Sequence, residues 1–103
     1  MLIHLGSVEQ FAEITKSGIV LVDFFATWCG PCKMLSPELE KLAEKDPSIN
    51  VLKVDVDEFG EIAAQFNVRA VPTLVLFKDG HALTQASGFR PLPSLEQFVN
   101  TAK

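Results

Sequence analysis

The chain has 103 residues, a net charge of −4 at neutral pH, and a composition that is 48% hydrophobic and 21% charged. This length is typical of one domain with its own core, and we expect residues 1–103 to form a single domain. An acidic chain without a lysine or arginine cluster is a poor partner for nucleic acid, because phosphate binding needs a basic surface. No run of about 18 apolar residues is present, so we expect no contact with a membrane.

The N-terminal ten residues, MLIHLGSVEQ, lack the basic region and the long apolar stretch of a signal peptide. We therefore expect the protein to be cytoplasmic, a compartment in which thiols persist and structural disulfides are rare.

The first elements are expected from apolar periodicity. After a possible short strand at Leu2–Leu5, residues 7–18 have a helical stripe, with Ser7 as the N-cap and Gln10 completing a capping box. Residues 19–25 are apolar and β-branched except for one aspartate. Such a continuous run is typical of a strand that is covered on both faces, as in a parallel sheet.

The middle of the chain continues this alternation. Residues 31–46 form an expected helix in which Pro37 should produce a kink. Residues 49–57 form a second buried strand, and residues 58–67 a third helix. Helices between consecutive strands require parallel pairing, because a tight turn cannot connect parallel strands.

The last third of the chain predicts a hairpin and a helix. Residues 72–87 read as two strands joined by Asp79-Gly80, a strong hairpin signal. Residues 94–103 form a final expected helix with Ser94 as its N-cap. The order of elements predicts an α/β fold with one mixed sheet that helices cover on both faces.

Both cysteines follow the first buried strand, in the motif Cys29-Gly-Pro-Cys32. This spacing allows half of a metal site, a structural disulfide or a redox-active dithiol. Zinc sites and iron–sulfur clusters need four ligands, whereas the chain has no second cysteine pair and only His4 and His81 elsewhere. A structural disulfide across so small a loop would remove little chain entropy.

A redox dithiol has a physical basis at this position. Positions i and i+3 of a helical turn are about 5–6 Å apart, which suits a disulfide. Pro31 favours a helix that begins at or near Cys29, whose sulfur then faces free N–H groups and the positive end of the helix dipole. We therefore expect Cys29 to attack as a thiolate and Cys32, one turn further and more buried, to resolve the mixed disulfide.

The segment Trp28-Cys29-Gly30-Pro31-Cys32-Lys33 resembles the active site of the thioredoxin family. The resemblance extends over essentially the whole chain, through Asp23-Phe24, Pro37, Lys53, Val71-Pro72-Thr73 and Gly88. One departure is Phe25, where many thioredoxins have a second tryptophan. The resemblance implies the thioredoxin fold, a central mixed β-sheet flanked by four helices.

The same resemblance implies a general protein-disulfide reductase whose Cys29–Cys32 pair alternates between dithiol and disulfide. It implies a monomer without a bound cofactor or metal, disulfide-containing protein substrates, and recycling by thioredoxin reductase, through which alone NADPH and FAD would act. An exported or membrane-tethered thiol oxidoreductase is one alternative. Another is a thioredoxin-fold interaction module or subunit with incidental redox activity, which would keep its biological activity with both cysteines replaced by serine.

Asp23 lies inside a buried strand, where a carboxyl has its charged form disfavoured. It could be a structural acid paired with Lys53. The resemblance implies instead that it lies behind Cys32 and acts as the proton acceptor of that thiol. Lys53 would then tune Asp23 by its charge, or would simply extend to solvent.

Several residues around Cys29 are implied to bind substrate. On sequence alone Pro72 marks the start of a strand, where a missing N–H costs nothing. The resemblance implies a cis Val71–Pro72 bond and a Val71 backbone that pairs with an extended substrate segment. It implies an apolar substrate surface made of Trp28, Gly30, Pro31, Val71, Pro72 and Gly88, with Phe89 beside them. The acidic runs EKLAEKD and DVDEFGE are interpreted as solvated faces.

Overall fold

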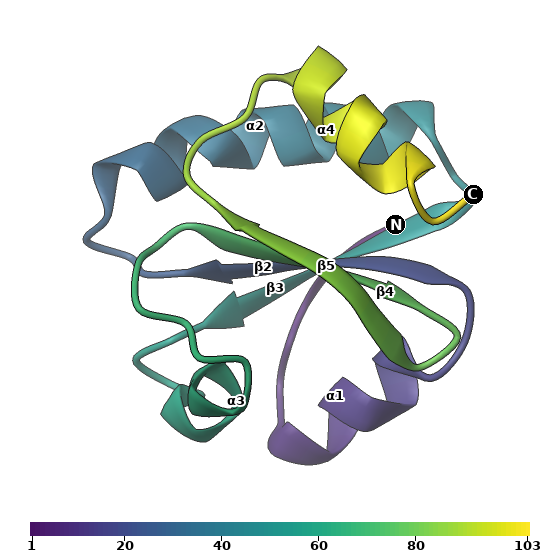
Figure 1. Ribbon diagram of the computed structural model, residues 1–103. Coiled ribbons are helices and arrows are strands. Elements are labelled where there is room, and N and C mark those ends of the chain that lie inside the picture. The colour runs from purple at the N-terminus through teal and green to yellow at the C-terminus, as the bar shows by residue number, and fades with distance from the viewer.

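A five-stranded sheet lies between two layers of helices in the computed structural model, which describes residues 1–103 (Figure 1). The elements follow the chain as β1 (Leu2–His4), α1 (Val8–Thr15), β2 (Ile19–Phe25), α2 (Gly30–Lys45), β3 (Ile49–Asp55), α3 (Gly60–Gln65), β4 (Thr73–Lys78), β5 (His81–Ser87) and α4 (Leu92–Asn100). The predicted mixed sheet with four helices is confirmed.

The strands are arranged in the order β1-β3-β2-β4-β5. Strands β1, β3 and β2 are parallel, whereas β4 pairs antiparallel with both β2 and β5. The two central strands, β2 and β3, are the two apolar runs that the sequence marks as covered on both faces. Their burial follows from their place in the order, because each has a neighbouring strand on either side and helices above and below.

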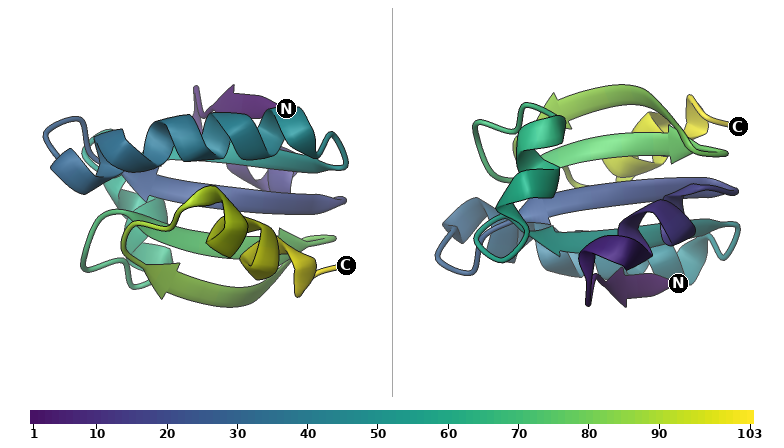
Figure 2. Two further views of the ribbon diagram at one scale, coloured as in Figure 1. Left: turned by 90° about the horizontal axis from the view of Figure 1, so that it is seen from above. Right: turned by 90° about the horizontal axis from the view of Figure 1, so that it is seen from below.

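Helices α2 and α4 cover one face of the sheet, and α1 and α3 cover the other (Figures 1 and 2). Alternate residues of each strand point to opposite faces. In β2, Leu21 therefore packs among the leucines of α2, while Val22 and Phe24 pack against α1 and α3. Asp23 shares the face of Leu21, so its carboxyl lies on the α2 side of the sheet.

The predicted position of Ser7 as an N-cap is confirmed, whereas the predicted capping box with Gln10 and the predicted cap at Ser94 are wrong. Ser7 is the N-cap of α1, but its side chain makes no capping hydrogen bond, and Gln10 instead accepts from the N–H of Gly6 at 2.9 Å. Helix α4 begins at Leu92 rather than at residue 94, so Ser94 lies inside its first turn and accepts a hydrogen bond from Arg90. The first turn tolerates proline, which allows the helix to start before Pro93.

The hairpin is found where the Asp79-Gly80 pair predicts it, between β4 and β5. Both residues have positive φ, 49° at Asp79 and 88° at Gly80, as a tight hairpin turn requires. The Asp79 carboxylate also accepts a hydrogen bond from the N–H of Gly18 at 2.8 Å, which ties the turn to the start of β2. None of the helices combines the length and the apolar composition that crossing a bilayer demands.

Candidate active site

Cys29 and Cys32 form a disulfide at the start of α2, with their Cα atoms 5.3 Å apart. Cys29 is the N-cap of this helix, and its sulfur accepts a hydrogen bond from the N–H of Cys32 at 3.2 Å. The predicted place of Cys29 at the positive end of the helix is thus confirmed. The expected difference in burial is small, because Cys29 is 5% and Cys32 is 3% exposed.

The loop before β4 lies against this disulfide. The Cys29 sulfur is 3.6 Å from the carbonyl oxygen of Val71, and the Val71–Pro72 peptide bond is cis. The N–H of Val71 makes no hydrogen bond within the chain, whereas the carbonyl of Pro72 accepts one from Gly88 at 2.9 Å. Val71 therefore presents an unpaired backbone donor beside the reactive sulfur, available to an extended partner segment.

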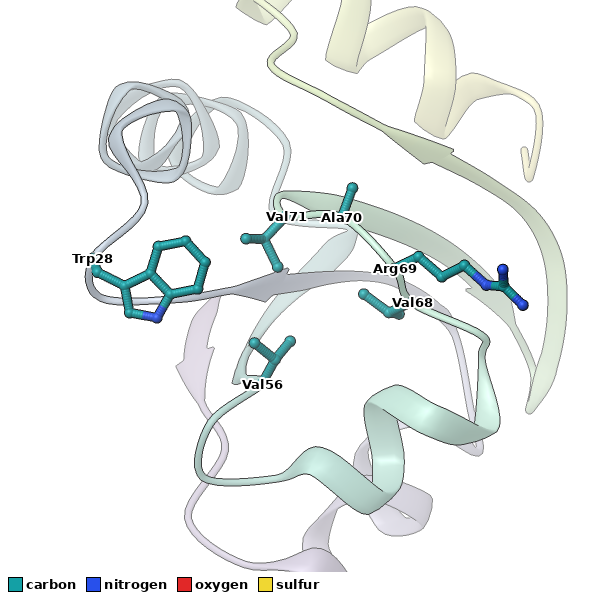
Figure 3. A pocket seen from close by; sticks show the side chains of 6 residues that line it. All are labelled: Trp28, Val56, Val68, Arg69, Ala70 and Val71. Carbon is teal, nitrogen blue, oxygen red and sulfur yellow. The ribbon is translucent and has the colours of Figure 1, made fainter.

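Trp28 closes one side of a pocket next to the cysteines (Figure 3). Trp28 is 69% exposed, and its ring is held by a hydrogen bond from Nε1 to a carboxylate oxygen of Asp57 at 2.9 Å. The cavity measures about 200 Å³ and is lined by Trp28, Val56, Val68, Arg69, Ala70 and Val71. The guanidinium of Arg69 points away from the indole, so the side chains that face the hollow are mainly apolar (Figure 3).

The other residues predicted to bind substrate differ in how accessible they are to a partner. Gly30 and Pro31 are exposed in the first turn of α2. Gly88 has a φ of 100°, and a Cβ at Gly88 or Gly30 would point into open space, so a partner backbone can approach both. Pro72 is buried, however, so it does not contribute exposed apolar surface.

Asp23 is fully buried, and neither oxygen of its carboxyl has a hydrogen-bond partner. Removal from water raises the pKa of Asp23 to about 6, and the positive charge of Lys53 opposes part of that rise. Asp23 lies beside Lys53 and Leu74 in the sheet register. A carboxyl with a pKa near neutrality can accept a proton and release it again under physiological conditions.

Lys53 does not extend to solvent, because it is only 8% exposed. Its ammonium nitrogen lies 3.9 Å from Oδ2 of Asp23, too far for a hydrogen bond. The ammonium instead donates to the hydroxyl of Ser36 on α2 and sits 4.8 Å from the centre of the Phe25 ring. The predicted pairing with Asp23 is thus a proximity of charges without direct contact.

A second small cavity lies beside both Lys53 and Cys32. It measures about 210 Å³, and its lining includes Cys32, Ser36 and Lys53 together with Phe25, Ala26, Thr27 and Lys33. Asp23 itself does not line the cavity, but Lys53 does, and its ammonium lies 3.9 Å from the Asp23 carboxyl. The arrangement places a titratable carboxyl, a cation and the second cysteine in one layer between the sheet and α2.

Sequence reasoning missed two residues of this site. Asp57 belongs to the run interpreted as a solvated face, and nothing in the sequence indicates that its carboxylate holds the Trp28 indole. Ser36 was not singled out, although it lies four residues after Cys32 and therefore on the same side of the helix. That spacing is the signal that could have found it.

A cysteine pair at the start of a helix, facing a loop with an unpaired backbone N–H, defines a dithiol–disulfide exchange site on an α/β scaffold. The comparisons agree with this class. The thioredoxin family model matches residues 3–101. The chain belongs to the thioredoxin family.

Thioredoxins from two bacteria show how extensive the similarity is. The thioredoxin of Chlamydia trachomatis is 46% identical over 99 residues, which cover 96% of this chain and 97% of the relative. The thioredoxin of Bacillus subtilis is 42% identical over 101 residues and 97% of each chain. Such similarity over nearly the whole length, together with the Cys29–Cys32 pair of this chain, supports activity as a thiol–disulfide oxidoreductase that reduces protein disulfides.

Solved structures give the same result for the fold. A mutant thioredoxin from Halobacterium salinarum superimposes with a TM-score of 0.92 at 37% identity, covering 98% of this chain and 89% of that one. Oxidised mitochondrial thioredoxin 3 from Saccharomyces cerevisiae gives 0.88 at 39% identity, covering 97% and 94%. The family membership implies disulfide-containing substrates and recycling by a reductase.

Proposed function

We propose that Cys29 is the nucleophile, Cys32 the resolving thiol and Asp23 the proton acceptor of a general, monomeric, cytoplasmic protein-disulfide reductase. The observation that carries this assignment is the Cys29 sulfur, which caps α2 and lies 3.6 Å from the Val71 carbonyl. Donation from the helix N-terminus stabilises a thiolate at that sulfur. The unpaired Val71 N–H beside it offers a docking point for substrate backbone.

The first step forms a mixed disulfide. The Cys29 thiolate attacks one sulfur of the substrate disulfide, and the other substrate sulfur leaves as a thiolate that takes a proton from solvent. The substrate segment lies as an extended strand against Val71, and an apolar side chain of the substrate occupies the pocket beside Trp28. The chain binds the substrate through the substrate's backbone and through one apolar side chain in a mainly apolar pocket. Because neither contact requires a particular sequence, many protein substrates can be accepted.

The second step releases the reduced substrate. The Cys32 thiol gives its proton to the Asp23 carboxylate by way of the cavity that Lys53 lines, and the Cys32 thiolate attacks the Cys29 sulfur. The bond between Cys29 and the substrate breaks, and the substrate sulfur leaves as a thiolate that takes a proton from solvent. The product is the Cys29–Cys32 disulfide seen in the structure. Thioredoxin reductase returns two electrons from NADPH through its flavin, and this chain binds neither cofactor.

Reduction of insulin, coupled to NADPH and a thioredoxin reductase, tests the function. We expect Cys29→Ser and Cys32→Ser to abolish turnover, while the surface variant His81→Ala serves as a control with unchanged rate. Cys32→Ser should accumulate a mixed disulfide with substrate, which mass spectrometry detects, and Cys29→Ser should not. Equal trapping by both variants would contradict the assigned order of attack.

The role of Asp23 needs a separate measurement. Asp23→Asn keeps the shape of the side chain but cannot accept the proton, so stopped-flow kinetics should show slower resolution of the mixed disulfide. The wild-type rate should fall with an apparent pKa near 6 as the pH is lowered, and the variant should lose that dependence. An unchanged rate between pH 6 and 8 would leave Asp23 a structural role only.

A further inference from the structure

The ammonium of Lys53 is enclosed by three different neighbours. It donates a hydrogen bond to the hydroxyl of Ser36, lies 4.8 Å from the centre of the Phe25 ring, and lies 3.9 Å from Oδ2 of Asp23. Lys53 is 8% exposed, so water cannot substitute freely for these contacts. The position of the ammonium therefore depends on the relative strength of its contacts with these three neighbours.

The ammonium contacts the two uncharged neighbours, Ser36 and Phe25, and makes no hydrogen bond to Asp23. A direct ammonium–carboxylate hydrogen bond is about 2.7–2.9 Å long, well short of the distance between Lys53 and Asp23. Both carboxyl oxygens of Asp23 are buried without a partner although a cation lies this close. The strongest acceptor in the region is thus left without a hydrogen bond while a serine hydroxyl receives one.

The positions of the neighbours explain this outcome. Ser36 and Phe25 line the cavity that opens beside Cys32, and Asp23 does not. Ser36 lies one turn after Cys32 on α2, and Phe25 ends β2 two residues after Asp23, on the same face. Both contacts draw the ammonium to the cavity side, away from the carboxyl.

We propose that Ser36 is a positioning residue that holds the Lys53 ammonium on the cavity side and prevents it from forming a hydrogen-bonded ion pair with Asp23. A direct pair would stabilise the carboxylate and make it a weaker base. With the ammonium held off, the Asp23 carboxyl keeps the raised pKa that a proton acceptor for Cys32 needs. The last point rests on the proposed function, whereas the positioning of Lys53 does not.

Other titratable groups near Asp23 are few and come from three elements. Strand β4 presents Leu74 opposite Asp23 and adds no charge there. The groups on the α2 side are Lys53 and Asp55 on β3, His4 on β1 opposite Lys53, and Cys32 and Lys33 on α2. Of these groups, Lys53 is the one whose charge lowers the pKa of Asp23. The position of the Lys53 ammonium therefore controls how far that pKa is lowered.

The direct test is the titration of the Asp23 carboxyl carbon by NMR in the oxidised full-length protein. In Ser36→Ala the hydroxyl is lost and the Asp23 carboxylate lies only 3.9 Å from the ammonium, so we expect the two to pair and the titration midpoint to fall by about one pH unit. Ser36→Thr retains the hydroxyl and should restore the wild-type midpoint. In a Lys53→Met background, Ser36→Ala should leave the midpoint of that background unchanged, because no ammonium is left to move.

An unchanged or higher midpoint in Ser36→Ala would overturn the proposal, as would a shift that persists in the Lys53→Met background. Thermal unfolding of each variant checks that the fold is retained. Kinetics separate this inference from the proposed function. If Asp23 is the proton acceptor, the pH dependence of mixed-disulfide resolution should move with the midpoint. A midpoint that falls while this dependence stays in place would support the positioning role and overturn the assignment of Asp23 as the base.

Discussion

The two faces of the sheet are built from alternate residues of the same strands and differ in kind. The face toward α1 and α3 has no buried charged side chain, and its phenylalanine rings Phe11, Phe24, Phe66 and Phe77 contact one another with centroids 5.5–5.8 Å apart. The face toward α2 and α4 has an apolar core of the same size but also holds Asp23 and Lys53.

This difference separates stability from chemistry within one small molecule. Val22 and Phe24 point to the aromatic face, and Asp23 between them points to the face that contains Cys32. A strand buried on both faces can therefore supply packing in one direction and a titratable group in the other. Burial of the carboxyl lowers the stability of the folded protein at the α2 face, and the packing of the aromatic face helps to offset this loss.

Removing a ring from the aromatic face should have the largest effect on stability. We expect Phe24→Ala to lower the free energy of unfolding by about 3–5 kcal/mol, because the fully buried ring leaves a cavity. No titratable group belongs to this cluster, so the loss should be the same at pH 5 and pH 8. Urea denaturation at both values measures it. A loss that changes with pH would show that the two faces are coupled.

Removing the buried charge should act in the opposite direction and depend on pH. The pKa of Asp23 is about 6 in the folded chain and near 3.8 without burial, so the folded state binds the proton more tightly. The contribution of Asp23 to stability is then most favourable below about pH 4, falls as the pH rises toward 6, and stays level above it.

Asp23→Asn should therefore raise the free energy of unfolding by about 3 kcal/mol at pH 8 and by little at pH 4. Parallel urea denaturation series of both proteins across this range would reveal the change of slope between pH 4 and 6. An equal gain at both ends of the range would mean that the amide improves packing and that the carboxyl is not penalised by its charge.

Removing a charge pair at the surface should have the smallest effect on the free energy of unfolding. Lys103 contacts Asp46 on the outside of the molecule, where water screens the interaction. We expect Lys103→Ala to lower the free energy of unfolding by less than about 1 kcal/mol, and the loss to shrink further in 1 M salt. Denaturation in low and high salt checks this. A loss comparable to that of Phe24→Ala would make the surface pair as important as the aromatic face.

Much of this molecule could be predicted from local signals. Asp79-Gly80 between apolar runs predicts the hairpin, and the continuous apolar runs of β2 and β3 predict strands covered on both faces. Proline after the first cysteine predicts a helix that starts at the cysteine pair, as found. These predictions succeed because turn geometry, burial on two faces and helix starts depend on residues that are close together in the chain. The capping box at Ser7 fails because Gln10 bonds to the N–H of Gly6, and the cap at Ser94 fails because the helix begins two residues earlier, at Leu92.

Contacts between distant residues were decided only by the tertiary structure. The sequence by itself determined the order of elements, the cysteine pair at a helix N-terminus and the presence of an aspartate in a buried strand. The fold decided that Asp57 holds the Trp28 indole across 29 residues and that Lys53 donates to Ser36 across 17. It also decided that Asp23 is left without a hydrogen bond, 3.9 Å from a cation. The physical reason is that an ammonium or a carboxylate can bond only to a partner that the packing of the fold places within reach. Those distances are set by the sheet register and by the position of α2 against the sheet.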